Sequence, residues 1–155
     1  MTNKTTLLLI AQRHALGLNA SELADLPTIN QNHRTIANYE RGDRNPSSNY
    51  IESMREISVL YYQLQASITT DIGLQKRQTS TPTLPYFVDF NDFERITGNN
   101  CKTYWRVWQS VIGHIVLIGD IDNLGDDADV PVSFKQTWFW LNGGYDAVDL
   151  VEDAQ

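Results

Sequence analysis

The chain has 155 residues, of which 41% are hydrophobic, and a formal net charge of −7. This length suits one domain or two small ones, and no apolar run approaches the ~18 residues that span a bilayer, so we expect a cytoplasmic protein without membrane contact. The single cysteine, Cys101, excludes an internal disulfide and a cysteine-rich metal site, and we interpret it as a passive thiol.

Two short helices are predicted at the start of the chain. The first runs from about Thr6 to Leu16, and Gly17 ends it because glycine readily adopts positive φ at a helix C-terminus. The second follows Asn19, whose side chain we expect to cap it while Glu22 completes a capping box. The residues available for burial in the first helix are Leu8, Leu9, Ala11, Ala15 and Leu16.

A third helix is predicted over residues 33–41. Asn32 is a suitable N-cap, Gly42 a suitable stop, and the following Pro46 prevents continuation of the helix. Ile36 and Tyr39 face one side and are expected in the core. The opposite side carries residue types that reach base edges or phosphates, namely His33, Arg34, Thr35 and Asn38.

A long helix over residues 48–75 is predicted next. Its apolar residues recur every three or four positions, as on one buried helix face. They are Ile51, Met54, Ile57, Tyr61, Leu64, Ile68 and Ile72. The polar, proline-bearing stretch over residues 78–85 then predicts a linker.

Mixed short elements are predicted beyond the linker. They comprise a strand over 86–88, a helix capped by Asn91 and ended by Gly98, and a helix over 104–117. Trp105, Trp108, Ile112 and Ile115 share one face of the last helix. An acidic loop over 120–129, a strand over 132–141 and a turn at 142–144 complete the prediction.

Two segments near the N-terminus carry a family resemblance. The pattern Arg13-x-x-Leu16-Gly17-Leu18-Asn19-x-x-Glu22-Leu23-Ala24, followed by Ile36-x-x-Tyr39-Glu40-Arg41-Gly42-x-Arg44-Asn45-Pro46, resembles the Cro/C1-type (XRE-like) helix-turn-helix. The turn between the second and third helices is longer than is usual in that family. The resemblance implies an ion pair between Arg13 and Glu40. It also implies that His33, Arg34, Thr35 and Asn38 read the major groove while Asn19, Ala20, Arg41 and Arg44 contact phosphates.

A narrower resemblance extends over about residues 7–121. Arg34-Thr35, Tyr86-x-x-x-x-Asn91-x-x-x-Arg95 and Trp105-Arg106-x-Trp108-Gln109-Ser110-Val111 resemble the YdiL-like regulators, which include anti-CRISPR-associated repressors. This resemblance implies a mainly α protein. It would have an N-terminal XRE-like helix-turn-helix bundle with a long linking helix (1–77) and a small α+β C-terminal dimerisation domain (84–155).

Charge is distributed unevenly along the chain. Residues 1–78 hold 8 Lys and Arg against 7 Asp and Glu, whereas residues 79–155 hold 4 against 12. The acidity therefore belongs to the second half, and the first half can still face phosphate. We expect a homodimeric repressor that binds an inverted repeat in double-stranded DNA, because one recognition helix covers too little duplex for selectivity.

The sequence also bears on two other functional classes. An antitoxin-like interaction protein would use the acidic half to bind a basic partner protein. An enzyme is not expected, because the sequence has no nucleophile–base constellation, phosphate-binding loop or metal-ligand spacing. The acidic stretch over 120–129 lacks the terminal Glu of a calcium loop, so neither a metal nor a cofactor is expected.

Overall fold

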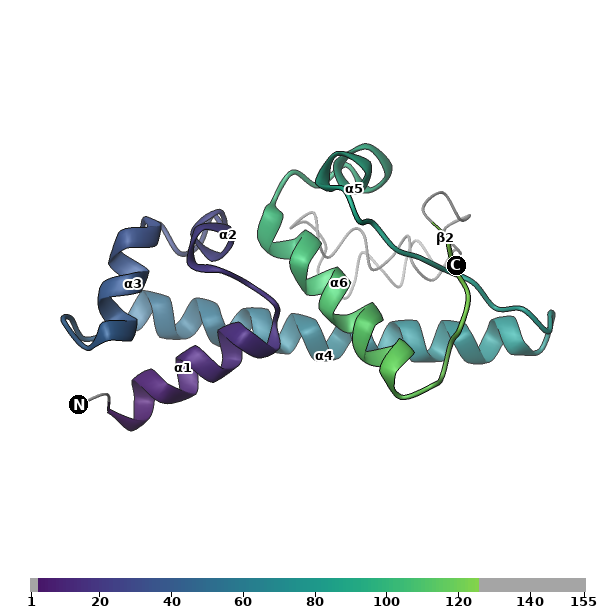
Figure 1. Ribbon diagram of the computed structural model, residues 1–155, viewed down its shortest axis with the longest axis horizontal. Helices are drawn as coiled ribbons and strands as arrows, with labels where there is room; N and C mark the ends of the chain where they lie inside the picture. Colours follow the sequence, from purple (N-terminus) through teal and green to yellow (C-terminus); the bar gives the residue numbers. More distant parts are fainter. Residues whose placement is uncertain (1–2, 126–155) are drawn as a thin grey trace, which may run out of the picture. The chain divides into compact units, whose positions relative to one another are not determined.

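The protein is mainly helical (Figure 1). The structure, a computed structural model, describes residues 3–125; the strand and turn predicted over 132–144 lie outside them. In chain order the elements are α1 (Lys4–Ala15), α2 (Ala20–Ala24), α3 (His33–Arg41), α4 (Ser48–Lys76), β1 (Leu84–Pro85), α5 (Phe90–Thr97), α6 (Lys102–Leu117) and β2 (Leu124–Gly125). None of these helices has the length and apolarity needed to cross a membrane.

The described residues form two compact units. One contains residues 3–63 and 101–111, and the other contains residues 64–100 and 112–125. Helices α4 and α6 each contribute to both units, so the units interleave along the chain. The predicted domains, 1–77 and 84–155, instead follow chain order, and the dimerisation role assigned to the second one stays a prediction.

In the first unit, α1 begins earlier than predicted. The side chain of Asn3 accepts a hydrogen bond from the backbone N–H of Thr6 and caps the helix, which starts at Lys4, two residues before the expected start. Thr6 and Leu9 face the core, whereas Leu8 is 58% exposed and Ala11 and Ala15 are also exposed. The burial predicted for Leu8, Ala11 and Ala15 was wrong, because the apolar stretch of α1 is wider than its buried face.

Helix α2 begins where predicted and α3 begins and ends where predicted, but α2 ends at Ala24, before Pro27, the residue at which the sequence predicts its end. Asn19 and Glu22 form the complete capping box at the start of α2. Asn32 caps α3, and Gly42 ends it with φ of 80°, a left-handed conformation that favours glycine. The local sequence signals at these ends are strong because each satisfies backbone groups that the helix itself leaves unpaired.

The first unit has a core between α3 and the start of α4 (Figure 1). The rings of Tyr39 and Tyr50 lie 5.1 Å apart between their centroids, and Ile36 and Met54 are fully buried. Of the apolar face predicted for the long helix, Ile51 is exposed and Tyr61 is half-buried. The other members, Met54, Ile57, Leu64, Ile68 and Ile72, are buried.

In the second unit, the predicted linker contains an ordered strand. Leu84 and Pro85 of β1 pair in parallel with Leu124 and Gly125 of β2, and Leu84 is fully buried. The strand predicted over 86–88 is therefore shifted to 84–85, and part of the predicted acidic loop is β2. The start of β1 is also held by α4, where the side chain of Gln75 accepts a hydrogen bond from the backbone N–H of Thr83 at 2.9 Å and donates to its carbonyl oxygen at 3.1 Å.

Helix α5 starts one position before the predicted cap. Asp89 is its N-cap and accepts from the backbone N–H of Asn91 at 2.7 Å, so Asn91 is not the cap. Gly98 ends the helix as predicted. The earlier start places Phe93 in contact with Phe87, with ring centroids 5.7 Å apart, and both side chains are fully buried. The predicted buried face of α6 is confirmed at Trp105, Trp108, Ile112 and Ile115.

Tyr50 makes the first unit sensitive to alkaline pH. Burial, with a smaller contribution from the nearby Glu40 carboxylate, raises the pKa of Tyr50 to about 12 from an ordinary value of 10.0. Between these values the unfolded chain loses the proton first, so the free energy of unfolding falls as pH rises. We expect wild type to lose about 1 kcal/mol more than Tyr50→Phe between roughly pH 9 and 11, measured by urea unfolding.

The matched control is Tyr62→Phe, because Tyr62 is exposed on the same helix. It should follow the wild-type pH dependence. At neutral pH Tyr50→Phe should not lose stability, since the buried Tyr50 hydroxyl has no hydrogen-bond partner in the part of the chain that the structure describes. Equal alkaline losses in wild type and Tyr50→Phe would contradict the assignment.

Candidate nucleic-acid interface

The outward side of α3 is the first candidate surface. His33 and Arg34 are exposed in its first turn, and Thr35 and Asn38 are half-buried beside them. Within residues 3–125, neither Arg34 nor the exposed Arg44 has an ion-pair partner. The surface therefore presents two guanidinium groups with unused donors, at the front of α3 and in the loop that follows it.

Three of the predicted contact residues on α3 are already engaged within the protein. The hydroxyl of Thr35 donates to Asn32 Oδ1 at 3.2 Å and so belongs to the cap of α3. Arg41 donates through Nη2 to Asn38 Oδ1 and through Nε to Asp43 Oδ2, the latter at 3.1 Å. Arg41 and Asp43 are both largely exposed, so these bonds are weak and can be exchanged for a bond to a ligand.

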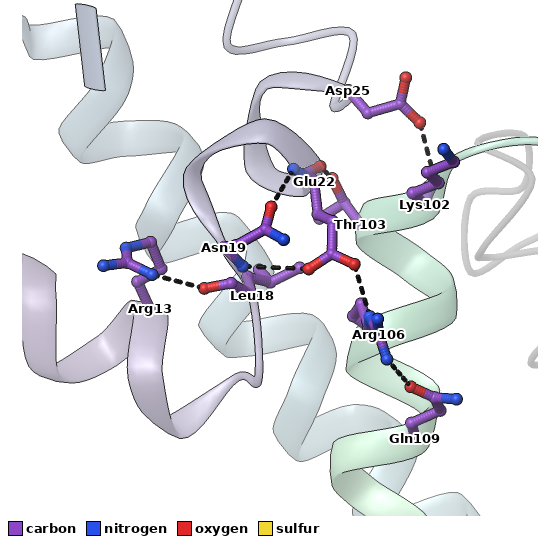
Figure 2. Close-up of polar contacts among 9 residues, drawn as sticks. All are labelled: Arg13, Leu18, Asn19, Glu22, Asp25, Lys102, Thr103, Arg106 and Gln109. Carbon is purple, nitrogen blue, oxygen red and sulfur yellow. Dashed lines mark hydrogen bonds and ion pairs between the residues drawn. The ribbon is translucent and has the colours of Figure 1, made fainter. Parts of the chain in front are cut away.

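Arg13 fixes α3 relative to α1. Its guanidinium donates through Nε to Glu40 Oε1 at 2.5 Å and through Nη2 to Glu40 Oε2 at 2.9 Å, which is a bidentate pair. A third bond runs from Nη1 to the carbonyl oxygen of Leu18 at 2.7 Å (Figure 2). The pair implied by the family resemblance is thus present, and it also holds the chain immediately before α2.

The N-terminus of α2 contains the other two predicted contact residues. Asn19 accepts from Glu22 N at 2.8 Å through its side chain, and its backbone N–H donates to Glu22 Oε1 at 3.0 Å. Ala20 begins the helix and is half-buried. Asn19 is exposed, so the start of α2 is accessible while its conformation is held by the capping box.

The long turn between α2 and α3 is ordered by α4. Asn49 donates through Nδ2 to the carbonyl oxygens of Thr28 and Ile29 at 2.8 and 3.0 Å. Gln31 donates to the hydroxyl of Ser47 at 2.9 Å, and Ile29 is fully buried. Sequence reasoning identified the longer turn but not the side chains of Ser47 and Asn49, just before and at the start of α4, that stabilise it.

Sequence reasoning also missed the contacts that α6 makes with α2 (Figure 2). Arg106 donates through Nε to Glu22 Oε2 at 2.5 Å, and the hydroxyl of Thr103 donates to the carbonyl oxygen of Glu22 at 2.6 Å. The backbone N–H of Lys102 donates to Asp25 Oδ2 at 2.7 Å. These residues are about eighty positions apart in the chain, so only the Trp105-Arg106-x-Trp108-Gln109-Ser110 pattern marked this region in advance.

Cys101 lies next to these contacts. Burial raises the pKa of its thiol, so the thiolate that would act as a nucleophile is disfavoured. Across the part of the chain with described coordinates, no group of three His, Cys, Asp or Glu side chains is arranged to hold a metal ion.

The first unit therefore presents, among the residues that the structure describes, a helix with two cationic side chains that have no ion-pair partner at its front and in the loop behind it, and the Arg13–Glu40 ion pair holds this helix to α1. Comparison with known proteins assigns the chain to a family. The Aca2/YdiL-like family matches residues 2–123, and the chain belongs to this family. Membership is consistent with a role in transcription regulation. No curated protein matches the chain.

The bidentate pair provides a test of how α3 is held. The side chains of Arg13 and Glu40 are only 13% and 20% exposed, so removal of one leaves the other charge poorly solvated. We expect Arg13→Met and Glu40→Met each to lower the free energy of unfolding by about 3 kcal/mol. The double variant should lose little more than either single variant, as measured by urea unfolding.

Arg55→Met is the matched control. Arg55 and Glu52 form an exposed pair with a 4.0 Å separation, so this variant should change stability by less than about 1 kcal/mol. Additive losses in the double variant would show that Arg13 and Glu40 act independently, against the bidentate geometry.

Proposed function

We propose that the protein is a sequence-specific double-stranded DNA-binding transcription regulator and not an enzyme. In this proposal α2 and α3 form a helix-turn-helix of the Cro/C1 type, and α3 enters the major groove. The observation that carries the proposal is Arg34, which is exposed and has no ion-pair partner among residues 3–125, on a helix whose orientation is fixed by the Arg13–Glu40 pair. A rigidly held guanidinium suits bidentate recognition of guanine.

The remaining exposed polar groups suit backbone contacts. Arg44 follows α3 in the chain, and Asn19 and Ala20 stand at the exposed start of α2. In protein–DNA complexes such groups fix the register and carry no base information directly. Asn38 and Arg41 would exchange their mutual bond for contacts to a base edge and a phosphate.

We further propose that the regulator binds an inverted repeat as a homodimer and represses its own or a neighbouring promoter. One recognition helix reads only a few base pairs, so selectivity in a genome requires two of them related by a two-fold axis. Half-sites would then be separated by about 34 Å or a multiple of it. Selection of bound fragments from random duplex DNA, with a mass measurement of the complex, identifies the site and the stoichiometry.

Arg34→Ala tests the reading helix. We expect loss of discrimination between the selected repeat and an unrelated duplex, by about tenfold or more, because a good bidentate contact is worth about 1–3 kcal/mol of discrimination. Circular dichroism and urea unfolding should remain as in wild type. Footprinting of the same repeat by Arg34→Ala would show that α3 does not read the sequence.

Arg44→Ala tests the backbone contacts. It should weaken binding to every duplex to a similar extent and reduce the slope of log Kd against log salt by about one unit, because one fewer phosphate is neutralised. Arg95→Ala is the control, since Arg95 is an exposed arginine in the second unit, paired with Asp92 at 3.3 Å. A slope that stays at the wild-type value in Arg44→Ala would argue against this contact.

The antitoxin-like alternative stays a prediction. Most of the acidic side chains that motivated it lie in residues 126–155, outside the described residues. Stoichiometric co-purification with a basic partner protein would favour it over the regulator.

A further inference from the structure

The contact between α6 and α2 explains how so short a helix is held in place. Helix α2 has five residues, which is far below the length at which a helix is stable by itself in water. Its N-terminal groups are satisfied by the capping box. Its C-terminal end is held from outside, where Thr103 donates to the carbonyl oxygen of Glu22 and Asp25 accepts from the first N–H of α6.

The side chain of Glu22 connects the start of α2 with α6. One carboxylate oxygen, Oε1, accepts from the backbone N–H of Asn19, and the other, Oε2, accepts from Arg106. The Glu22 side chain is 11% exposed, so its charge depends on this guanidinium for compensation. Arg106 therefore holds the same carboxylate that closes the capping box around Asn19, at the accessible start of α2.

Arg106 is itself preorganised. Its Nη1 donates to Gln109 Oε1 at 2.7 Å, and its guanidinium carbon lies 4.2 Å from the centroid of the buried Trp105 ring. Further along α6, the hydroxyl of Ser110 donates to the carbonyl oxygen of Ala15 at 2.8 Å and so connects the same helix to the end of α1. Because these contacts fix the Arg106 guanidinium on α6, the position of α6 determines the position of the Glu22 carboxylate.

We propose that Arg106 is a positioning residue for DNA binding, which acts by holding Glu22 and thereby the N-terminus of α2 against the DNA backbone. This inference rests on the proposed function. Arg106 does not contact DNA in this arrangement. Its loss changes the fit of α2 to phosphates and leaves base reading to α3, which is held separately by Arg13 and Glu40.

The test measures Kd on the selected repeat and on an unrelated duplex, over a range of salt concentrations. Arg106→Gln should weaken binding to both duplexes by about tenfold with an unchanged salt slope, because the α2 groups that it displaces, at Asn19 and Ala20, are uncharged and neutralise no phosphate. Arg106→Lys should recover most of the affinity, since it keeps a cation facing Glu22. Arg95→Gln is the control, and all variants are compared at a temperature at which their unfolding curves show them folded.

Glu22→Gln separates the ion pair from the capping box. Glutamine preserves the box at this helix position but removes the charge that faces Arg106. It should reproduce the loss seen in Arg106→Gln, and the double variant should lose no more than either single variant. This non-additivity would support a shared action of the two residues on α2.

Three results would overturn the inference. Unchanged affinity in Arg106→Gln, with discrimination still lost in Arg34→Ala, would remove the positioning role and leave the proposed function intact. A salt slope reduced by about one unit in Arg106→Gln would mean that Arg106 contacts a phosphate directly. Failure of the wild-type protein to bind any duplex would overturn the proposed function and this inference together.

Discussion

The bonds of the Arg13 guanidinium set the geometry of the first unit. One side chain on α1 holds a carboxylate on α3 through two nitrogens and a backbone carbonyl before α2 through a third. Because all three partners are acceptors, and the guanidinium is planar with fixed donor directions, the arrangement tolerates little rotation of α3. The exposed face of α3, with Arg34 at its front, is consequently presented in one orientation.

A second constraint acts on α2, from residues far away in sequence. The end of α2 and the start of α6 satisfy each other's unpaired backbone groups, through Asp25 on one side and Thr103 on the other. These hydrogen bonds provide partners for a carbonyl oxygen at the end of α2 and an N–H group at the start of α6, which would otherwise have to bond to water. The Trp105-Arg106-x-Trp108-Gln109-Ser110 segment combines both roles in one helix, with buried tryptophans on its apolar face and Arg106 on the side facing α2.

The first of these constraints bears on how the α3 surface would meet DNA. Binding by a short helix is strong only if its side chains do not lose much freedom on contact. Arg34 lies on a helix that the Arg13–Glu40 pair fixes in place. Asn38 and Arg41, in contrast, are hydrogen-bonded to each other at the surface, and a ligand can replace that bond. The unit thus combines a fixed α3 with surface groups that can change partner.

The sequence by itself determined the start of α2, both ends of α3, the C-terminal end of α5 and the buried face of α6. Caps such as Asn19, Asn32 and Gly42 act on backbone groups within a few residues, so local sequence is sufficient to place them. The Arg13–Glu40 pair was reached through the family resemblance, and local reasoning alone would not have joined residues so far apart.

Only the tertiary structure decided which residues of α1 are buried, that Leu84 and Pro85 form a strand with Leu124 and Gly125, and that Arg106 meets Glu22. The Gln75 contacts turn a proline-bearing polar stretch into ordered backbone. Each of these features depends on groups separated by eight to eighty-four positions. Bringing such distant groups together costs conformational entropy, which only the folding of the whole unit compensates. A local sequence pattern therefore does not predict which of these groups will pair.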